Sequence, residues 1–147
     1  MQAVATLSSA DLTQGSALRF SVLRLGRRLR QQRTDLTLSL TQLAVLGTLY
    51  RHDELTPREL ADHEKVSPPS MTKILAGLEE RGLITRSPHP TDGRQQLVRP
   101  TKEAVAILRA DRRKRDAWLA RRLAELTAEE RAVLHAATPI LERLAAS

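Results

Sequence analysis

The sequence contains no cysteine, which excludes disulfides, thiolate zinc sites and cysteine redox switches. Aromatic residues are also scarce, at 2% of the chain, so aliphatic side chains and alanine must fill the core. We find no apolar run long enough to span a bilayer, and no basic segment followed by an apolar one of the kind that directs secretion. We therefore expect a cytoplasmic protein without a membrane partner.

The residue patterns of common enzymes are missing as well. The chain has no glycine-rich phosphate loop and no recognisable catalytic triad, and no histidine is placed by sequence to activate a serine. Its four histidines do not follow the spacing of a zinc site. A metal site formed by His63 with Asp62 and Glu64 is an alternative, but a histidine at a helix end or on the surface is the more common outcome. We expect no catalytic residues, no metal and no cofactor.

The net charge of +7 favours an anionic partner, but its distribution is uneven. The basic excess lies in residues 1–36 and 101–126, whereas residues 55–100 are nearly neutral. The run RADRRKRD (109–116) could bind DNA or a membrane. The interpretation we favour is a solvated helix face with ion pairs between Asp111 and Arg115 and between Arg112 and Asp116.

The centre of the chain predicts two short helices joined by a tight turn. In TPRE, Thr56 is placed to cap a helix and Glu59 to complete a capping box. In SPPSMTKILAGLEERG, Ser67 can cap a second helix whose first turn holds two prolines, and Gly82 ends it. Apolar residues recur on one face of that helix, leaving small polar and basic groups on the others: this pattern is typical of a helix-turn-helix.

Two strand-like runs, LITRS (83–87) and QQLVR (95–99), follow on either side of PHPTDG. Such a turn predicts a β-hairpin next to the helix-turn-helix. Arg86, Arg94 and Arg99 would be available on this hairpin to face DNA. The predicted fold is therefore mainly α, with a small β-hairpin wing on a helix-turn-helix core.

These motifs, taken in order, resemble the MarR family of winged-helix transcriptional regulators. The resemblance is carried by LEERGLITR (78–86) at the end of the recognition helix and by Asp92-Gly93-Arg94 in the wing. It covers residues 37–104. The chain departs from the family pattern at Glu64-Lys65, where Leu-Gly often precedes the turn, and at Gly93, where many members have a second arginine.

The resemblance implies a DNA-binding transcriptional regulator, a repressor in the typical case, with double-stranded DNA as its partner. Groove contacts are then expected from the start of the recognition helix, and phosphate or minor-groove contacts from the wing. The expected DNA-binding residues are Ser67, Pro69, Ser70, Thr72, Lys73, Arg86, Asp92 and Arg94.

The flanking segments are predicted to be helices that form a homodimer. Residues 9–33 and 101–125 read as long helices, and TAEE (127–130) caps a last one. Another helix is expected from near Leu40 to about His52, with SLTQ (39–42) as its capping box. The apolar residues of the flanking helices exceed what one chain can cover. We expect three segments: a dimerisation helix in 1–36, a DNA-binding domain in 37–100 and C-terminal dimerisation helices in 101–147. A two-fold dimer would read a pseudo-palindrome with half-sites about 34 Å apart.

The family is typically released from DNA by small aromatic ligands bound near the dimerisation helices. Phe20, Tyr50 and Trp118 could line such a pocket here, although scattered aromatic residues are more often part of a core. A different function class stays open as well, namely a low-specificity, architectural DNA-binding protein with the same fold.

Overall fold

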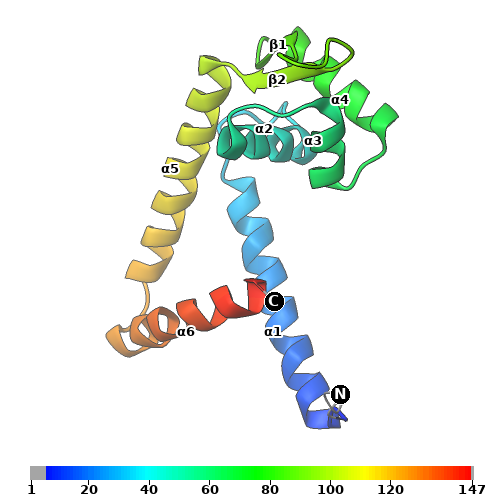
Figure 1. Cartoon of the computed structure of the whole chain (residues 1–147). Coiled ribbons are helices and arrows are strands. Elements are labelled where there is room, and N and C mark those ends of the chain that lie inside the picture. The colour runs from blue at the N-terminus through cyan, green and yellow to red at the C-terminus, as the bar shows by residue number, and fades with distance from the viewer. Residues whose placement is uncertain (1–5, 147) are drawn as a thin grey trace. The chain divides into compact units, whose positions relative to one another are not determined.

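The computed structural model describes residues 6–146. Figure 1 shows helices throughout this part of the chain, interrupted by one β-hairpin. In chain order the elements are α1 (Ser9–Gln31), α2 (Leu40–His52), α3 (Pro57–Glu64), α4 (Pro68–Glu80), β1 (Ile84–Pro88), β2 (Gln96–Pro100), α5 (Lys102–Ala124) and α6 (Ala128–Ala146). The predicted fold class, mainly α with a hairpin wing, is confirmed.

Contacts within the chain form two compact units. One unit is Arg33–Lys114, which holds α2, α3, α4, the hairpin and the first half of α5. The other consists of the described parts of Met1–Gln32 and Arg115–Ser147, and so holds α1, the end of α5 and α6. Helix α5 therefore belongs to both units.

Capping boxes set the start of four helices, as the sequence predicts for three of them. In each box, a Ser or Thr side chain before the helix accepts the N–H of the third helical residue. The side chain of that third residue accepts the backbone N–H of the Ser or Thr in return. The two bonds satisfy N–H groups that have no partner within the helix. The predicted boxes at Ser39, Thr56 and Thr127 are present. A fourth, at Ser8 with Asp11, also occurs at the start of α1.

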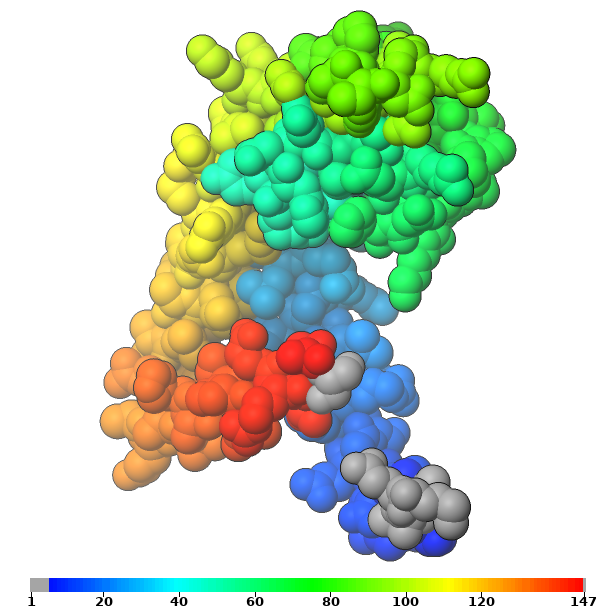
Figure 2. All heavy atoms as spheres, in the orientation of Figure 1, coloured from blue at the N-terminus to red at the C-terminus, as the bar shows by residue number. Residues whose placement is uncertain are grey.

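The core of the Arg33–Lys114 unit is built from aliphatic side chains, as the scarcity of aromatic residues requires. Helix α4 contributes Met71, Leu75 and Leu78, each at most 1% exposed. They pack with buried residues of the other elements, which are Leu38, Val45, Leu46, Leu49, Leu55, Leu60, Ala61, Leu83, Ile84, Val98 and Ala104. Figure 2 shows the segments of this unit packed closely together. The predicted inward face of α4 is confirmed, with Ile74 at its half-buried edge.

The hairpin pairs β1 with β2 in antiparallel register, from Ile84 opposite Pro100 to Pro88 opposite Gln96. Each strand begins one residue later than the sequence predicts. For β1 the reason is that Leu83 takes part in the cap that follows α4. Its N–H donates to the carbonyl of Leu78 at 2.9 Å, across Gly82 at φ +69°. The structure therefore confirms the predicted left-handed stop at Gly82.

Leu55 extends the sheet by one bridge. Its N–H donates to Val98 at 3.2 Å and its carbonyl accepts from Val98 at 2.8 Å. The start of α3 is thereby tied to the second strand of the wing. This link holds the wing against the helical body.

The predicted ion pairs of the basic run on α5 are wrong for Asp111. This carboxylate is only 2% exposed and accepts from the N–H and hydroxyl of Thr34 at 2.7 and 2.9 Å. Lys114 donates to the carbonyl of Arg33 at 3.0 Å on the same side. Through these bonds the run holds the segment before α2 against α5. The run is therefore not solvated throughout.

Helices α1 and α6 have no buried residue within the described chain. The exposed apolar side chains on these two helices include Leu18, Val22, Leu25, Val133, Leu134, Ile140, Leu141 and Leu144. No helix among residues 6–146 is long and apolar enough to cross a membrane.

The turn between α3 and α4 places a lysine in an unfavourable conformation. Lys65 ends α3 at φ 53° and ψ 44°, the left-handed region that residues with a Cβ rarely adopt. Glu64 beside it accepts from the Thr48 hydroxyl at 2.6 Å. Position 65 therefore carries strain that a residue tolerant of left-handed backbone would relieve.

We predict that Lys65→Asn raises the free energy of unfolding by about 0.5–1 kcal/mol, because asparagine adopts this conformation more readily. Chemical denaturation would measure the change. Lys65→Ala is the matched control: it removes the same side chain but keeps the strain, so it should not stabilise. Equal effects of the two substitutions would contradict the explanation.

Candidate nucleic-acid interface

The start of α4 is capped by its own serines, as predicted. The Ser67 hydroxyl oxygen accepts the N–H of Ser70 at 3.3 Å, and its O–H donates to the Ser70 hydroxyl at 2.9 Å. Pro68 and Pro69 occupy the first two helical positions, where no intrahelical donor is needed. The first turn therefore holds its conformation without contacts from outside the helix.

The predicted groove-contact residues lie on the exposed side of α4. Pro69, Ser70, Thr72 and Lys73 are all exposed, whereas Met71 between them is buried. Thr72 donates its hydroxyl proton to the Pro68 carbonyl at 3.0 Å, so its lone pairs remain available to a donor on a base or to water. Burial of one face thus fixes which side chains of α4 point outward.

The tip of the wing is ordered by short side-chain bonds. The Asp92 carboxylate accepts the backbone N–H of Arg94 at 3.1 Å, and the His89 ring nitrogen accepts from the N–H groups of Thr91 and Asp92 at 3.2 and 3.1 Å. Asp92 therefore acts on the backbone of Arg94 and leaves its guanidinium group free of that carboxylate. Arg94 itself is exposed.

The other two arginines of the hairpin have partners. The Arg86 Nε donates to Glu79 on α4 at 3.2 Å, and Arg99 pairs with Glu54 in front of α3. Sequence reasoning placed Arg86 on DNA phosphate, but could not find this pairing, because Glu79 is seven residues away and on another element. In the structure Arg86 braces the recognition helix against the first strand of the wing.

The comparisons with known proteins agree with this geometry. The sequence profile of the MarR family matches residues 38–95. The HTH-type transcriptional regulator Mb0904 of Mycobacterium bovis is 42% identical over 132 residues, which are 90% of this chain and 92% of that protein. The chain belongs to the MarR family.

Solved structures of other proteins share this fold. A Pseudomonas aeruginosa protein, described as a transcriptional regulator, has a TM-score of 0.85 and 37% identity, covering 95% of this chain and 99% of its own. An S. aureus MepR variant bound to an oligodeoxyribonucleotide has a TM-score of 0.71 and 23% identity, over 89% and 97% of the two chains. MepR has also been solved with ethidium bromide, at a TM-score of 0.62 over 88% and 95%.

As a MarR-family protein with this winged helix, the chain is a transcriptional regulator with a DNA-binding fold. The names of its relatives indicate regulation and not catalysis. Among residues 6–146 no three potential metal ligands cluster. His63 lies against the ring of His52 at 4.8 Å, and Glu64 is engaged by Thr48.

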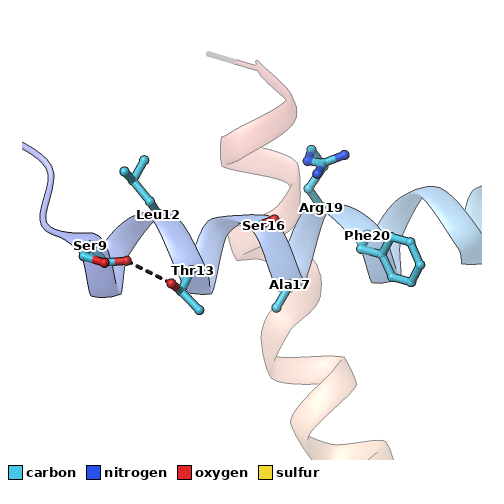
Figure 3. A pocket seen from close by; sticks show the side chains of 7 residues that line it. All are labelled: Ser9, Leu12, Thr13, Ser16, Ala17, Arg19 and Phe20. Atoms are coloured by element: carbon cyan, nitrogen blue, oxygen red, sulfur yellow. Dashed lines mark hydrogen bonds between the residues drawn. The ribbon is translucent and has the colours of Figure 1, made fainter.

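Each of the three aromatic residues considered for a ligand pocket has different surroundings. Phe20 is 58% exposed and lines a shallow hollow whose seven residues all come from α1 (Figure 3). Trp118 lies between the guanidinium groups of Arg28 and Arg122, 5.7 and 5.4 Å from its ring centre. Tyr50 belongs to the other compact unit and is 44% exposed. The alternative that these residues form a core is wrong for Phe20 and Tyr50 within the single chain.

The end of α4 is anchored by a pair of contacts that sequence reasoning missed. Arg81 donates to the Asp35 carboxylate at 2.5 Å and to the Thr37 hydroxyl at 2.9 Å. Asp35 also accepts from the N–H and hydroxyl of Thr37. The segment before α2 therefore fixes the end of the recognition helix of this MarR-family protein. No local pattern reveals the contact, because 46 residues separate Asp35 from Arg81.

These contacts lower the pKa of Asp35, mainly through the hydrogen bonds from Thr37, with a smaller contribution from the Arg81 guanidinium. A lowered native pKa means that the charged carboxylate stabilises the fold above its ordinary pKa of 3.8. This stabilisation is lost as the pH falls from there through the native value.

We predict that Asp35→Asn destabilises the protein at neutral pH, and that the difference from wild type shrinks below about pH 4. Thermal unfolding as a function of pH would measure this. Glu80→Gln is the control, since it removes an exposed carboxylate next to Arg81 that makes no hydrogen bond or ion pair with the described residues. A difference between Asp35→Asn and wild type that is the same at pH 3 and pH 7 would contradict the role of the charge.

Proposed function

We propose that this protein is a sequence-specific repressor that binds a pseudo-palindromic operator as a homodimer. The observation that carries the proposal is the capped first turn of α4, whose small polar and basic side chains point outward beside an ordered wing. A helix of this kind fits the major groove, where each base pair presents a distinct pattern of donors and acceptors.

The proposed major-groove contacts come from the exposed side chains at the start of α4. Ser70, Thr72 and Lys73 would contact base edges in the major groove, and Pro69 could lie against a thymine methyl group. Ser67 would bind a phosphate only by turning its O–H away from Ser70. The helix N-terminus would attract the phosphate through its partial positive charge, because Pro68 and Pro69 carry no N–H. MepR, which shares the fold, has been solved with an oligodeoxyribonucleotide.

The wing would add contacts outside the major groove. Arg94 would enter the minor groove, held in place by the turn that Asp92 forms around its backbone. Arg86 would reach a phosphate only by sharing its guanidinium with Glu79, or by leaving it. We therefore expect Arg94 to contribute more to DNA affinity than Arg86.

The homodimer is supported by the exposed apolar faces of α1 and α6. Leu12, Phe20 and Leu23 of α1 and Val133 and Leu144 of α6 are each more than half exposed in the single chain. Large apolar side chains left exposed in such number along a helix usually mark an interface. A two-fold dimer built on these helices would present two copies of α4 to DNA, as a pseudo-palindrome requires. Such a regulator would work in the cytoplasm, where operator DNA lies.

The first experiment is selection of bound sequences from a random pool of duplexes, with the mass of the protein measured in solution. We predict enrichment of a pseudo-palindrome with half-sites about one helical turn apart, bound by a dimer. Enrichment of no sequence, despite binding, would instead favour an architectural DNA-binding protein. A monomer at the concentrations used for binding would contradict the dimer.

Release by a small aromatic ligand is the second part of the proposal. It is supported by the ethidium complex of MepR and by the exposed ring of Phe20. A ligand that binds the DNA-free form would lower operator occupancy by shifting the population. We predict that salicylate-like aromatic acids raise the melting temperature of the free protein and weaken operator binding, and that Phe20→Ala reduces both effects. No shift in either quantity would exclude this class of ligand.

A further inference from the structure

The arginines of the winged-helix segment differ in whether they have partners. Residues 38–100 hold six arginines, of which Arg51, Arg81, Arg86 and Arg99 bond to a hydroxyl or a carboxylate. The guanidinium groups of Arg58 and Arg94 make no hydrogen bond or ion pair with any described residue. These two guanidinium groups therefore add no hydrogen bond or ion pair to the fold.

Both unpartnered arginines line the same hollow. It has a volume of about 410 Å³ and lies between the start of α3 and the wing, and its lining residues are Thr56, Pro57, Arg58, Arg94, Gln95 and Gln96. No acidic side chain lines it. The nearest carboxylates in sequence are already engaged: Glu59 binds Thr56, and Asp92 binds the N–H of Arg94.

The two arginines are held in a defined relation by the backbone. Leu55, three residues before Arg58, is joined to Val98 by two hydrogen bonds, and Val98 lies in the strand that follows Arg94. Glu54 adds an ion pair with Arg99 on the same strand. The wing and the start of α3 therefore form one rigid frame around the hollow.

Arg58 also occupies a position that helix stability disfavours. It is the second residue of α3, where the partial positive charge of the helix N-terminus repels a cation. An exposed arginine at this position, without a partner among residues 6–146, has no evident structural purpose. A role in binding an anion explains its presence.

We infer that the hollow binds a phosphate of the DNA backbone, with Arg58 as an additional DNA-binding residue beside Arg94. This rests on the proposed function and adds α3 to the surface that contacts the operator. Guanidinium groups bind phosphate oxygens in bidentate fashion, and two of them in one hollow would neutralise the charge of a phosphodiester. The contact would fix the register of the protein on the duplex without reading its sequence.

The test is the salt dependence of DNA affinity for Arg58→Gln and wild type. The probes are the duplex enriched from the random pool and an unselected duplex, each about 30 base pairs long, or three helical turns. Loss of one phosphate contact per protomer should reduce the slope of log K against log salt by about 1.8 in the dimer, and weaken binding at least about tenfold at 0.1 M salt. Both duplexes should show the reduced slope and the weaker binding, because a phosphate contact does not depend on the base sequence.

Two matched variants separate a local contact from net charge. Arg58→Lys keeps the charge and should retain most of the slope. Arg113→Gln removes another exposed arginine, on α5, and should leave the slope unchanged. An equal loss of slope with Arg113→Gln would overturn the inference. The melting temperature of Arg58→Gln should stay the same or rise slightly, whereas a structural role for Arg58 predicts a fall.

The outcomes distinguish failure of this inference from failure of the proposed function. If wild type binds DNA and Arg58→Gln binds it with the same slope, the inference alone is wrong. If wild type binds neither duplex, the proposed function is wrong. Titration with inorganic phosphate, followed by NMR of the arginine side chains, tests the other source of the anion. The inference would be overturned if millimolar phosphate saturated Arg58 while Arg58→Gln had no effect on DNA binding. The hollow would then be a site for a free anion.

Discussion

Burial of one face of α4 is the constraint on which the DNA-binding surface depends. Met71, Leu75 and Leu78 can leave water only if the helix turns this face to the core, and each fully buried side chain contributes about 1.5–3 kcal/mol. Rotation of α4 would expose these residues, so Ser70, Thr72 and Lys73 must point outward. The direction of the candidate groove contacts therefore follows from packing, and the polar residues themselves need no tertiary contact to keep it.

The features that the sequence predicts well are those formed by residues close together along the chain. The capping boxes at Ser39, Thr56 and Thr127 and the left-handed residue Gly82 each involve a few neighbouring positions, so spacing alone identifies them. The face of α4 follows from helical periodicity in the same way. Together these local signals determine the order of the elements and the outward residues of the candidate site.

The features that the sequence did not predict are contacts between distant residues. The charges of Asp111 and Arg115 suit an ion pair four residues apart, yet Asp111 binds Thr34, because packing of α5 removes this carboxylate from water and it must then find donors. As arginines on the hairpin, Arg86 and Arg99 are expected to contact DNA. Only the tertiary structure shows that they pair with Glu79 and Glu54. Residue type indicates which side chains can bind phosphate, but pairing decides which of them remain free.

Helix α1 has few contacts within the single chain that would stabilise it. An isolated helix of this length gains little from its own hydrogen bonds in water, since most helical stability in proteins comes from packing of an apolar face. Yet α1 has 23 residues, and among the described residues it buries none of them. Its capping box and its contact between Arg28 and Trp118 are worth only about 1–2 kcal/mol together. The proposed homodimer would stabilise α1, because a second copy would cover this exposed face symmetrically with the same leucines.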